Sequence, residues 1–228
     1  MVTPLFYRLS YDILRDFEPV SLFASTPFVL VSHPSLPVKT LDDLIKLAKA
    51  NPGRLNYSAA NAGSTTMLIA EMFKSGAHVN IVHVPYKSVS AALTDTIAGQ
   101  VLLSSTLAVT ALSQIQAHKL RALAVSTPQR SAVLPDVPTF GEQGLPNVEG
   151  TGWFGLVAPA RTPAAVITRM NAEVVKALRK PDVRKRILSL ANEPVSNTPD
   201  EYMAYMKADI ARWSLAVKEA GIKISAQP

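Results

Sequence analysis

The stretch Arg54–Gly76, RLNYSAANAGSTTMLIAEMFKSG, carries the pattern that decides the fold. Its first residues have the composition of a short strand, and Thr65–Ser75 has the apolar spacing of an amphipathic helix with the final glycine as its stop. Nine small and polar residues, Ser58–Thr66, connect the two. This junction is either an ordinary turn in which Ser64 or Thr65 caps the helix, or a site that holds a small anion at a helix N-terminus.

The alternation of strand and helix continues along the chain. Thr40 is a good N-cap for a helix that Asn51-Pro52-Gly53 ends, and Pro27 separates two short apolar strands. Expected strands are 19–25, 27–33, 54–58, 79–86, 100–105, 120–127 and 150–160, and expected helices are 40–50, 65–75, 90–98, 110–118, 139–143, 163–179, 181–191 and 198–220. This spacing predicts an α/β fold with a largely parallel, helix-covered sheet, followed by a mostly helical last third.

Composition excludes several classes of protein. The 228 residues are 48% hydrophobic and 18% charged, which suits one large or two small packed domains. No cysteine and no HExxH motif occur, so we expect no metal site. The net charge is +6, but its densest run, RKPDVRKRIL at 179–188, is interrupted by Asp182 and alternates with apolar residues like the solvated face of a helix. We therefore expect no nucleic-acid binding.

Membrane and secretion signals are not visible in the chain. No apolar run approaches the ~20 residues that a membrane-spanning helix needs. The first residues, MVTPLFYRLSYDILRDFEP, lack a basic stretch followed by an apolar one, so they do not resemble a signal peptide.

Catalytic patterns are also missing. The sequence contains neither GxSxG, GxxxxGK[ST] nor GxGxxG. Asp42 and Asp43 stand at a helix start, where the helix dipole explains them, and Asp95 and Asp136 are isolated. We expect no enzyme activity and no cofactor.

Three junctions between a strand and a helix are rich in hydroxyl groups. The first is Ser58–Thr66, the second contains Tyr86, Lys87 and Ser88, and the third contains Ser105 and its neighbours. In a parallel sheet these junctions share the carboxyl edge, where α/β proteins bind ligands. Many neutral donors at one edge favour recognition of a carboxylate.

Longer motifs resemble a known family. They are YDILRDFEPVSLFASTPFVLVSHPSLPVKTLDDLIKLAKANPGRLNYSAAN, VNIVHVPYKS with AALTDTIAGQV, HKLRALAVSTPQRSAVLPDVPTFGEQGLPNVEGTGWFGLVAPARTPAAVI, and ARWSLAVKEAGIKI. In this order, from Tyr11 to Ile224, they are similar to the Bug (TctC-like) family, the extracytoplasmic solute-binding receptors of tripartite tricarboxylate transporters.

The resemblance implies a periplasmic-binding-protein-like fold of type II, with two α/β lobes that enclose a ligand. It implies a receptor without catalysis that delivers a small carboxylated metabolite to membrane permease subunits. Family ligands are di- and tricarboxylates, acidic amino acids and aromatic acids. A periplasmic location is implied as well.

The resemblance also implies site residues. The family's S-S-G-N-G-T-S loop falls on Ser58–Ser64, its Y-K-G-G falls on Tyr86–Val89, and a polar Asp-Asn strand end falls near Ser105-Thr106. Trp153 and Phe154 lie on the strand that returns to the first lobe. The expected ligand-binding residues are Ser58, Ala60, Asn61, Ala62, Gly63, Ser64, Thr65, Tyr86, Lys87, Ser88, Ser105, Thr106, Trp153 and Phe154.

The chain departs from the family pattern in two ways. Alanines replace loop glycines, and Ser105-Thr106 removes a carboxylate, so the ligand or its affinity is expected to differ. Family members also begin with a signal peptide and further strands of the first lobe. We therefore expect 1–22 to be a remnant of that lobe with a crossover, 23–149 a complete second lobe, and 150–228 the helical end of an incomplete first lobe. An alternative is a truncated structural protein that has lost ligand binding and self-associates through that lobe.

Overall fold

The computed structural model describes residues 2–61, 63–219 and 221, and the chain divides into two compact units. Unit 1 consists of Met1–Ser25 and Trp153–Pro228, and unit 2 of Thr26–Gly152. Two strands, β1 (Phe17–Ser32) and β6 (Thr151–Pro159), are the segments along which the chain passes from one unit to the other.

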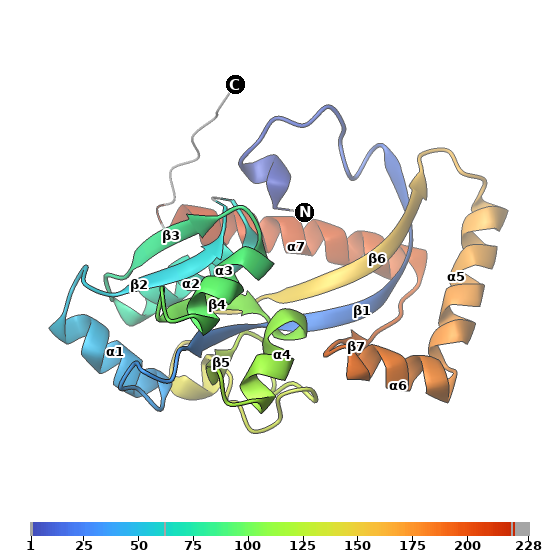
Figure 1. Cartoon of the computed structure of the whole chain (residues 1–228). Coiled ribbons are helices and arrows are strands. Elements are labelled where there is room, and N and C mark those ends of the chain that lie inside the picture. Colours follow the sequence, from blue (N-terminus) through green and yellow to red (C-terminus); the bar gives the residue numbers. More distant parts are fainter. Residues whose placement is uncertain (1, 62, 220, 222–228) are drawn as a thin grey trace. The chain divides into compact units, whose positions relative to one another are not determined.

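Unit 2 is built from alternating strands and helices (Figure 1). After β1 they are α1 (Leu41–Ala50), β2 (Asn56–Ala60), α2 (Thr65–Ala77), β3 (Val82–Tyr86), α3 (Val89–Ile97), β4 (Leu103–Leu107), α4 (Ala108–Gln116), β5 (Arg121–Val125) and the 3-10 turn η2 (Gly141–Gln143). The predicted α/β class is confirmed by this architecture.

The sheet is mostly parallel, but one strand inside it, β1, runs in the opposite direction. The strand order is β3-β2-β4-β1-β5, with β2 parallel to β3 and to β4. β1 runs antiparallel to both β4 and β5. The alternation of strand and helix does not predict this direction, because β1 enters the sheet from unit 1 rather than through a helical crossover within unit 2.

Adjacent residues of β2 show which helices cover which face of the sheet. Tyr57 bonds to Glu71 of α2, and Ser58 bonds to Thr96 of α3. Because successive side chains of a strand point to opposite faces, α2 and α3 cover opposite sides of β2. Both faces are buried, as expected of a parallel sheet.

The core on the α3 face is continuous. It joins Val29 and Val31 of β1 to Leu93 of α3 and to Ala108 and Ala111 of α4. These side chains are at most 5% exposed, so they hold β1 and the two helices in fixed positions on this face.

One strand replaces the two that were predicted around Pro27. The prediction of a break was wrong, since β1 continues through this residue. Pro27 falls between Ser25, which pairs with β7, and Phe28, where pairing with β4 begins. The missing N–H of proline therefore does not interrupt either of these ladders.

Unit 1 contains fewer strands. Its elements are η1 (Thr3–Leu5), the first part of β1, most of β6, α5 (Ala164–Leu178), α6 (Pro181–Ser189), β7 (Glu193–Pro194) and α7 (Pro199–Glu219). Two small clusters form its described core, one around Val20 and Ile167 and the other around Leu22, Tyr202 and Met206.

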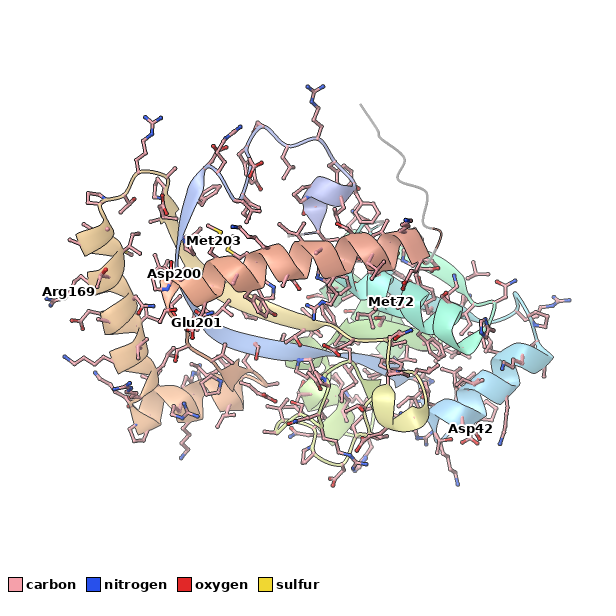
Figure 2. All side chains as sticks on the ribbon, turned by 180° about the vertical axis from the view of Figure 1, so that it is seen from behind. Asp42, Met72, Arg169, Asp200, Glu201 and Met203 are labelled. Atoms are coloured by element: carbon pink, nitrogen blue, oxygen red, sulfur yellow. The ribbon has the colours of Figure 1, made fainter. Side chains whose placement is uncertain are left out.

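Local signals in the sequence set several helix ends. Thr40 and Asp43 form the reciprocal capping box that starts α1, as predicted. Thr198 and Glu201 do the same for α7, whose first turn also holds Asp200 (Figure 2). The predicted stop at Gly76 is wrong, since α2 is two residues longer than predicted: it runs to Ala77, and the next residue closes it in a left-handed conformation.

The described part of the chain contains neither a membrane-spanning helix nor a metal-binding cluster. No described helix is long and apolar enough to cross a membrane. Among the same residues, no group of three His, Asp or Glu side chains is arranged to hold a metal ion.

Candidate functional site

Three helices begin along one edge of the sheet in unit 2. The parallel strands β2 and β3 end together, with Ala60 opposite Tyr86, and β4 lies on the other side of β2 with Ser104 opposite Ser58. The segments that lead into α2, α3 and α4 therefore leave the sheet at the same edge, as the sequence predicted. Backbone N–H groups in the first turn of a helix have no acceptor within it and carry the positive end of its dipole. This edge can stabilise an anion.

The start of α2 decides between the two readings of the Ser58–Thr66 junction. Ser64 is the N-cap and accepts a hydrogen bond from Met67 N at 3.2 Å. Thr66 Oγ1 accepts from Ala60 N at 3.3 Å and lies 3.1 Å from Ser64 Oγ. The capping interpretation is therefore confirmed, but the N–H groups of Thr65 and Thr66 have no acceptor within the helix.

The loop before this cap has one demanding backbone position. Gly63 has φ +83°, a conformation that other residues adopt only at a cost. Asn61 is exposed, and its carbonyl accepts from Ser64 N at 3.0 Å, which closes the turn. Ala62, also expected to bind ligand, lies outside the described residues.

The start of α3 presents a donor and a positive charge. Ser88 is the N-cap and accepts from Ala91 N at 3.1 Å. Because an accepting hydroxyl keeps its own hydrogen, the exposed Ser88 can still donate one hydrogen bond. Lys87 is exposed beside it and adds an ammonium group at the same edge.

Tyr86 is less available than the sequence suggested. Its hydroxyl donates to Asp95 Oδ2 at 2.7 Å, and this bond, together with burial, raises the pKa of Tyr86. The sequence analysis described Asp95 as isolated, which was wrong. Seven residues separate it from the N-cap Ser88, so two turns of α3 bring it to the same side of the helix, a spacing that could have revealed the pair.

The remaining predicted hydroxyls are enclosed in the sheet. Ser58 Oγ lies 2.8 Å from Thr96 Oγ1, and Thr106 Oγ1 lies 3.0 Å from Thr110 Oγ1. Ser105 Oγ is also buried, but no described residue is bonded to it. Ser58 and Thr106 therefore hold helices on the sheet, whereas the hydroxyl of Ser105 has no structural task.

A scan against protein families matches residues 1–222 to the model described as the tripartite tricarboxylate transporter family receptor, TctC. This chain belongs to the TctC family. The resemblance stated from the sequence is thereby confirmed. The family is one of solute-binding receptors rather than of enzymes.

Individual family members agree with this assignment. Protein BugT of Bordetella pertussis is 34% identical over 95% of this chain and 66% of its own length. The solved structure of R. palustris Rpa4515 with adipate is 35% identical, with a TM-score of 0.87 over 94% of this chain and 72% of the other. MatC (Rpa3494) from Rhodopseudomonas palustris with bound malate is 29% identical, with a TM-score of 0.83 over 95% and 74%. The chain spans about two thirds of the length of the curated relatives it matches.

Two further residues expected to bind ligand in this TctC-family chain belong to unit 1. The indole N–H of Trp153 donates to Asp209 Oδ2 at 3.0 Å, and its ring meets Tyr202 and Tyr205 edge-on. Its polar group is thus already bonded within unit 1.

Phe154 differs from its neighbour in sequence. It is 41% exposed and stacks on Phe23, with ring centroids 6.4 Å apart. Phe23, at 38% exposure, is a surface residue that the sequence reasoning missed, because it lies in an ordinary apolar strand pattern.

Proposed function

We propose that this chain binds a small carboxylate at the edge where α2 and α3 begin, and that it serves as a receptor of a tripartite tricarboxylate transporter. The observation that carries this proposal is the pairing of Ala60 with Tyr86. This pairing supports a site in which the starts of two helices point their N–H groups at one ligand.

The chemistry of this edge suits a carboxylate. Thr65 and Thr66 offer backbone N–H groups, Ser88 a hydroxyl and Lys87 a charged donor. Asn61 adds an exposed amide. Neutral donors with one ammonium group can bind a carboxylate oxygen by charge-assisted hydrogen bonds without burying a full ion pair.

The ligand is proposed to be a dicarboxylate. This follows from the adipate and malate in the titles of two related structures, which are statements about those proteins. For Trp153 and Phe154, the ligand-binding role expected from the sequence stays a prediction. The permease partner, the periplasmic location and the correspondence of unit 2 to the second lobe are parts of the same proposal.

Isothermal titration calorimetry tests the proposal. Adipate and malate should each bind with saturable heat, whereas acetate, which has a single carboxylate, should bind at least about tenfold more weakly if two carboxylates are recognised. Lys87→Gln should weaken binding by about tenfold, because a hydrogen bond to a charged group is lost. A folded sample that gives no heat with any of the dicarboxylates would contradict the proposal.

The control variant is Lys119→Gln. Lys119 is also exposed, but it follows α4 and precedes β5, at the opposite edge of the sheet. It should leave the dissociation constant unchanged. An equal loss in both variants would mean that Lys87 acts only through the net charge of the protein.

A second candidate is self-association through unit 1. Eight of the nine exposed large hydrophobic side chains among the described residues belong to that unit. Exposed apolar side chains favour association where they lie together, as the stacked rings of Phe23 and Phe154 do. Light scattering separates the two proposals: a monomer that responds to ligand supports the receptor, and an oligomer indifferent to ligand supports the structural protein.

A further inference from the structure

The positive charge of the chain is concentrated in one short segment. Residues 176–190 contain six Lys and Arg and a single acidic residue, Asp182. This net charge of +5 accounts for almost all of the +6 carried by the 228 residues. The basic residues are Lys176, Arg179, Lys180, Arg184, Lys185 and Arg186, which we call the α6 basic cluster.

All six side chains of the α6 basic cluster are exposed. They lie at the end of α5, at the turn that follows and on α6, which Figure 1 shows as consecutive helices of unit 1. No described residue forms an ion pair with any of the six. Arg169, earlier on α5 and visible in Figure 2, is by contrast paired with Glu173 at 3.1 Å. The charges of the cluster are therefore free to act on something outside the chain.

Apolar side chains accompany the charges. α6 contains no buried residue, which is unusual for a helix of a globular protein. Leu188 is 41% exposed, and Leu190, immediately after the helix, is 46% exposed. Lys180, Arg184 and Leu188 follow one another at intervals of four residues, so the exposed leucine lies on the same face as two of the charges.

We propose that the α6 basic cluster, with Leu188 and Leu190, docks onto a lipid surface that carries anionic headgroups. Clusters of four to eight Lys and Arg on a helix with an exposed apolar edge have the composition of such interfacial segments. The basic stems lie along the surface and the leucines enter the boundary between headgroups and acyl chains. This inference does not depend on the ligand site in unit 2.

A lipid surface fits the cluster better than a protein or a nucleic acid. Half of the six residues are lysines, which are depleted from protein interfaces. Among the described residues, none forms an ion pair that would hold one of the six in a fixed orientation. A protein partner that accepts bidentate hydrogen bonds would favour such a fixed orientation. The segment 176–190 contains no aromatic residue on which a base could stack.

Vesicle co-sedimentation of the whole chain tests the proposal. The chain should partition onto vesicles of phosphatidylcholine with 30 mole per cent phosphatidylglycerol at low salt and should stay in solution with phosphatidylcholine alone; the ~30% content is chosen to give a strongly negative surface. Raising the salt to about 0.5 M should release it, since the Debye length then falls well below 10 Å. Equal binding to both kinds of vesicle would overturn the proposal.

The decisive variant reverses three charges, Arg184→Glu, Lys185→Glu and Arg186→Glu. It should lower partitioning by at least about 100-fold, because each basic residue near such a surface contributes about 1 kcal/mol. The matched control is Lys39→Glu, Lys49→Glu and Arg54→Glu, three exposed basic residues of unit 2. Both triple variants have the same net charge, so an equal loss in the control would overturn the role of the cluster.

A second pair of changes tests the apolar contribution. Leu188→Ser with Leu190→Ser should weaken partitioning by about tenfold and make the remainder fully sensitive to salt. Tryptophan fluorescence checks folding, because both tryptophans lie in unit 1, where these variants are made. Unchanged partitioning of the triple reversal in a folded sample would overturn the proposal.

Discussion

Each unit contains a helix carboxylate that accepts hydrogen bonds from two donors. One donor is an aromatic side chain on a strand, and the other is a Lys or Arg three residues further along the same helix. The two carboxylates differ in how deeply they are buried. In unit 2, Glu71 of α2 accepts from the Tyr57 hydroxyl at 2.6 Å and from Lys74 at 2.8 Å. The Glu71 side chain is 18% exposed. Water therefore still screens this cluster in part.

In unit 1 the corresponding cluster is deeper. Asp209 of α7 accepts from Trp153 and from Arg212, and its side chain is 2% exposed. Unit 1 nevertheless holds most of the exposed large apolar side chains. Unit 2 is thus stabilised mainly by a continuous apolar core, whereas unit 1 depends more on a few buried polar and aromatic contacts.

The largest expected loss of stability comes from removing the carboxylates of Asp209 and Glu71. Asp209→Ala should destabilise unit 1 by about 3–5 kcal/mol, because Arg212 and the Trp153 N–H lose a buried partner. Glu71→Ala should cost unit 2 only about 1–3 kcal/mol, because Glu71 and Lys74 are partly exposed to water and only the buried Tyr57 hydroxyl is left without its partner. Urea unfolding followed by tryptophan fluorescence reports on unit 1, and far-UV circular dichroism reports on both. If Glu71→Ala loses more stability than Asp209→Ala, unit 2 rather than unit 1 depends more on its carboxylate.

The next largest change in stability is expected when Gly155 or Gly76 is replaced by alanine. A Cβ at Gly155 would lie 2.1 Å from the hydroxyl of the buried Tyr202, so Gly155→Ala should cost unit 1 about 1–3 kcal/mol. At Gly76, inside α2, the nearest atom is at an ordinary 3.5 Å. Gly76→Ala should therefore stabilise unit 2 by up to about 1 kcal/mol. If Gly155→Ala and Gly76→Ala unfold at the same urea concentration, the Tyr202 side chain moves away from the added methyl group without a measurable cost.

Mild acid should destabilise unit 2 more than unit 1, because all four histidines lie in unit 2. Burial lowers the pKa of His83, which stacks on Tyr57 with ring centroids 5.0 Å apart, while nearby Glu71 opposes the shift. A lowered folded-state pKa favours the neutral ring, so this contribution to stability is present above the unfolded value of about 6.5 and is lost as pH falls below it.

His83→Phe keeps a ring in this place and removes the titration. The difference between the urea midpoints at about pH 7.5 and about pH 5, measured by circular dichroism, should shrink in the variant. His118→Asn is the control, because His118 is exposed and asparagine tolerates its φ of +54°. A difference unchanged by His83→Phe would assign the acid sensitivity to other groups.

The smallest changes in stability are expected when buried hydroxyl groups of unit 2 are removed. Ser105→Ala should change the free energy of unfolding by less than about 0.5 kcal/mol, because no described residue bonds to Ser105 Oγ. Ser58→Ala should cost about 1–2 kcal/mol, because Thr96 loses a buried partner. If Ser105→Ala instead weakens binding of adipate or malate without loss of stability, the hydroxyl belongs to the ligand site.

Much of unit 2 could be predicted from the sequence, and the reasons are local. The Thr40 capping box, the apolar periodicity of α2 and the β-branched composition of β3 act within a few residues of one another. The shared edge of β2 and β3 also followed from the order of strands and helices. The role of Ser58 could not be predicted, because Thr96 becomes its neighbour only when α3 packs on the sheet.

The sequence by itself determined the family, the α/β class and the positions of most helices and strands, since periodicity, capping and turn chemistry are properties of neighbouring residues. Only the tertiary structure decided that β1 runs antiparallel between β4 and β5 and that Ser58 of β2 bonds to Thr96 of α3. It also decided that the basic residues of α6 are exposed and form no ion pair with any residue that the structure describes. These features depend on residues far apart in the chain, and their free energies arise only when folding brings those residues together.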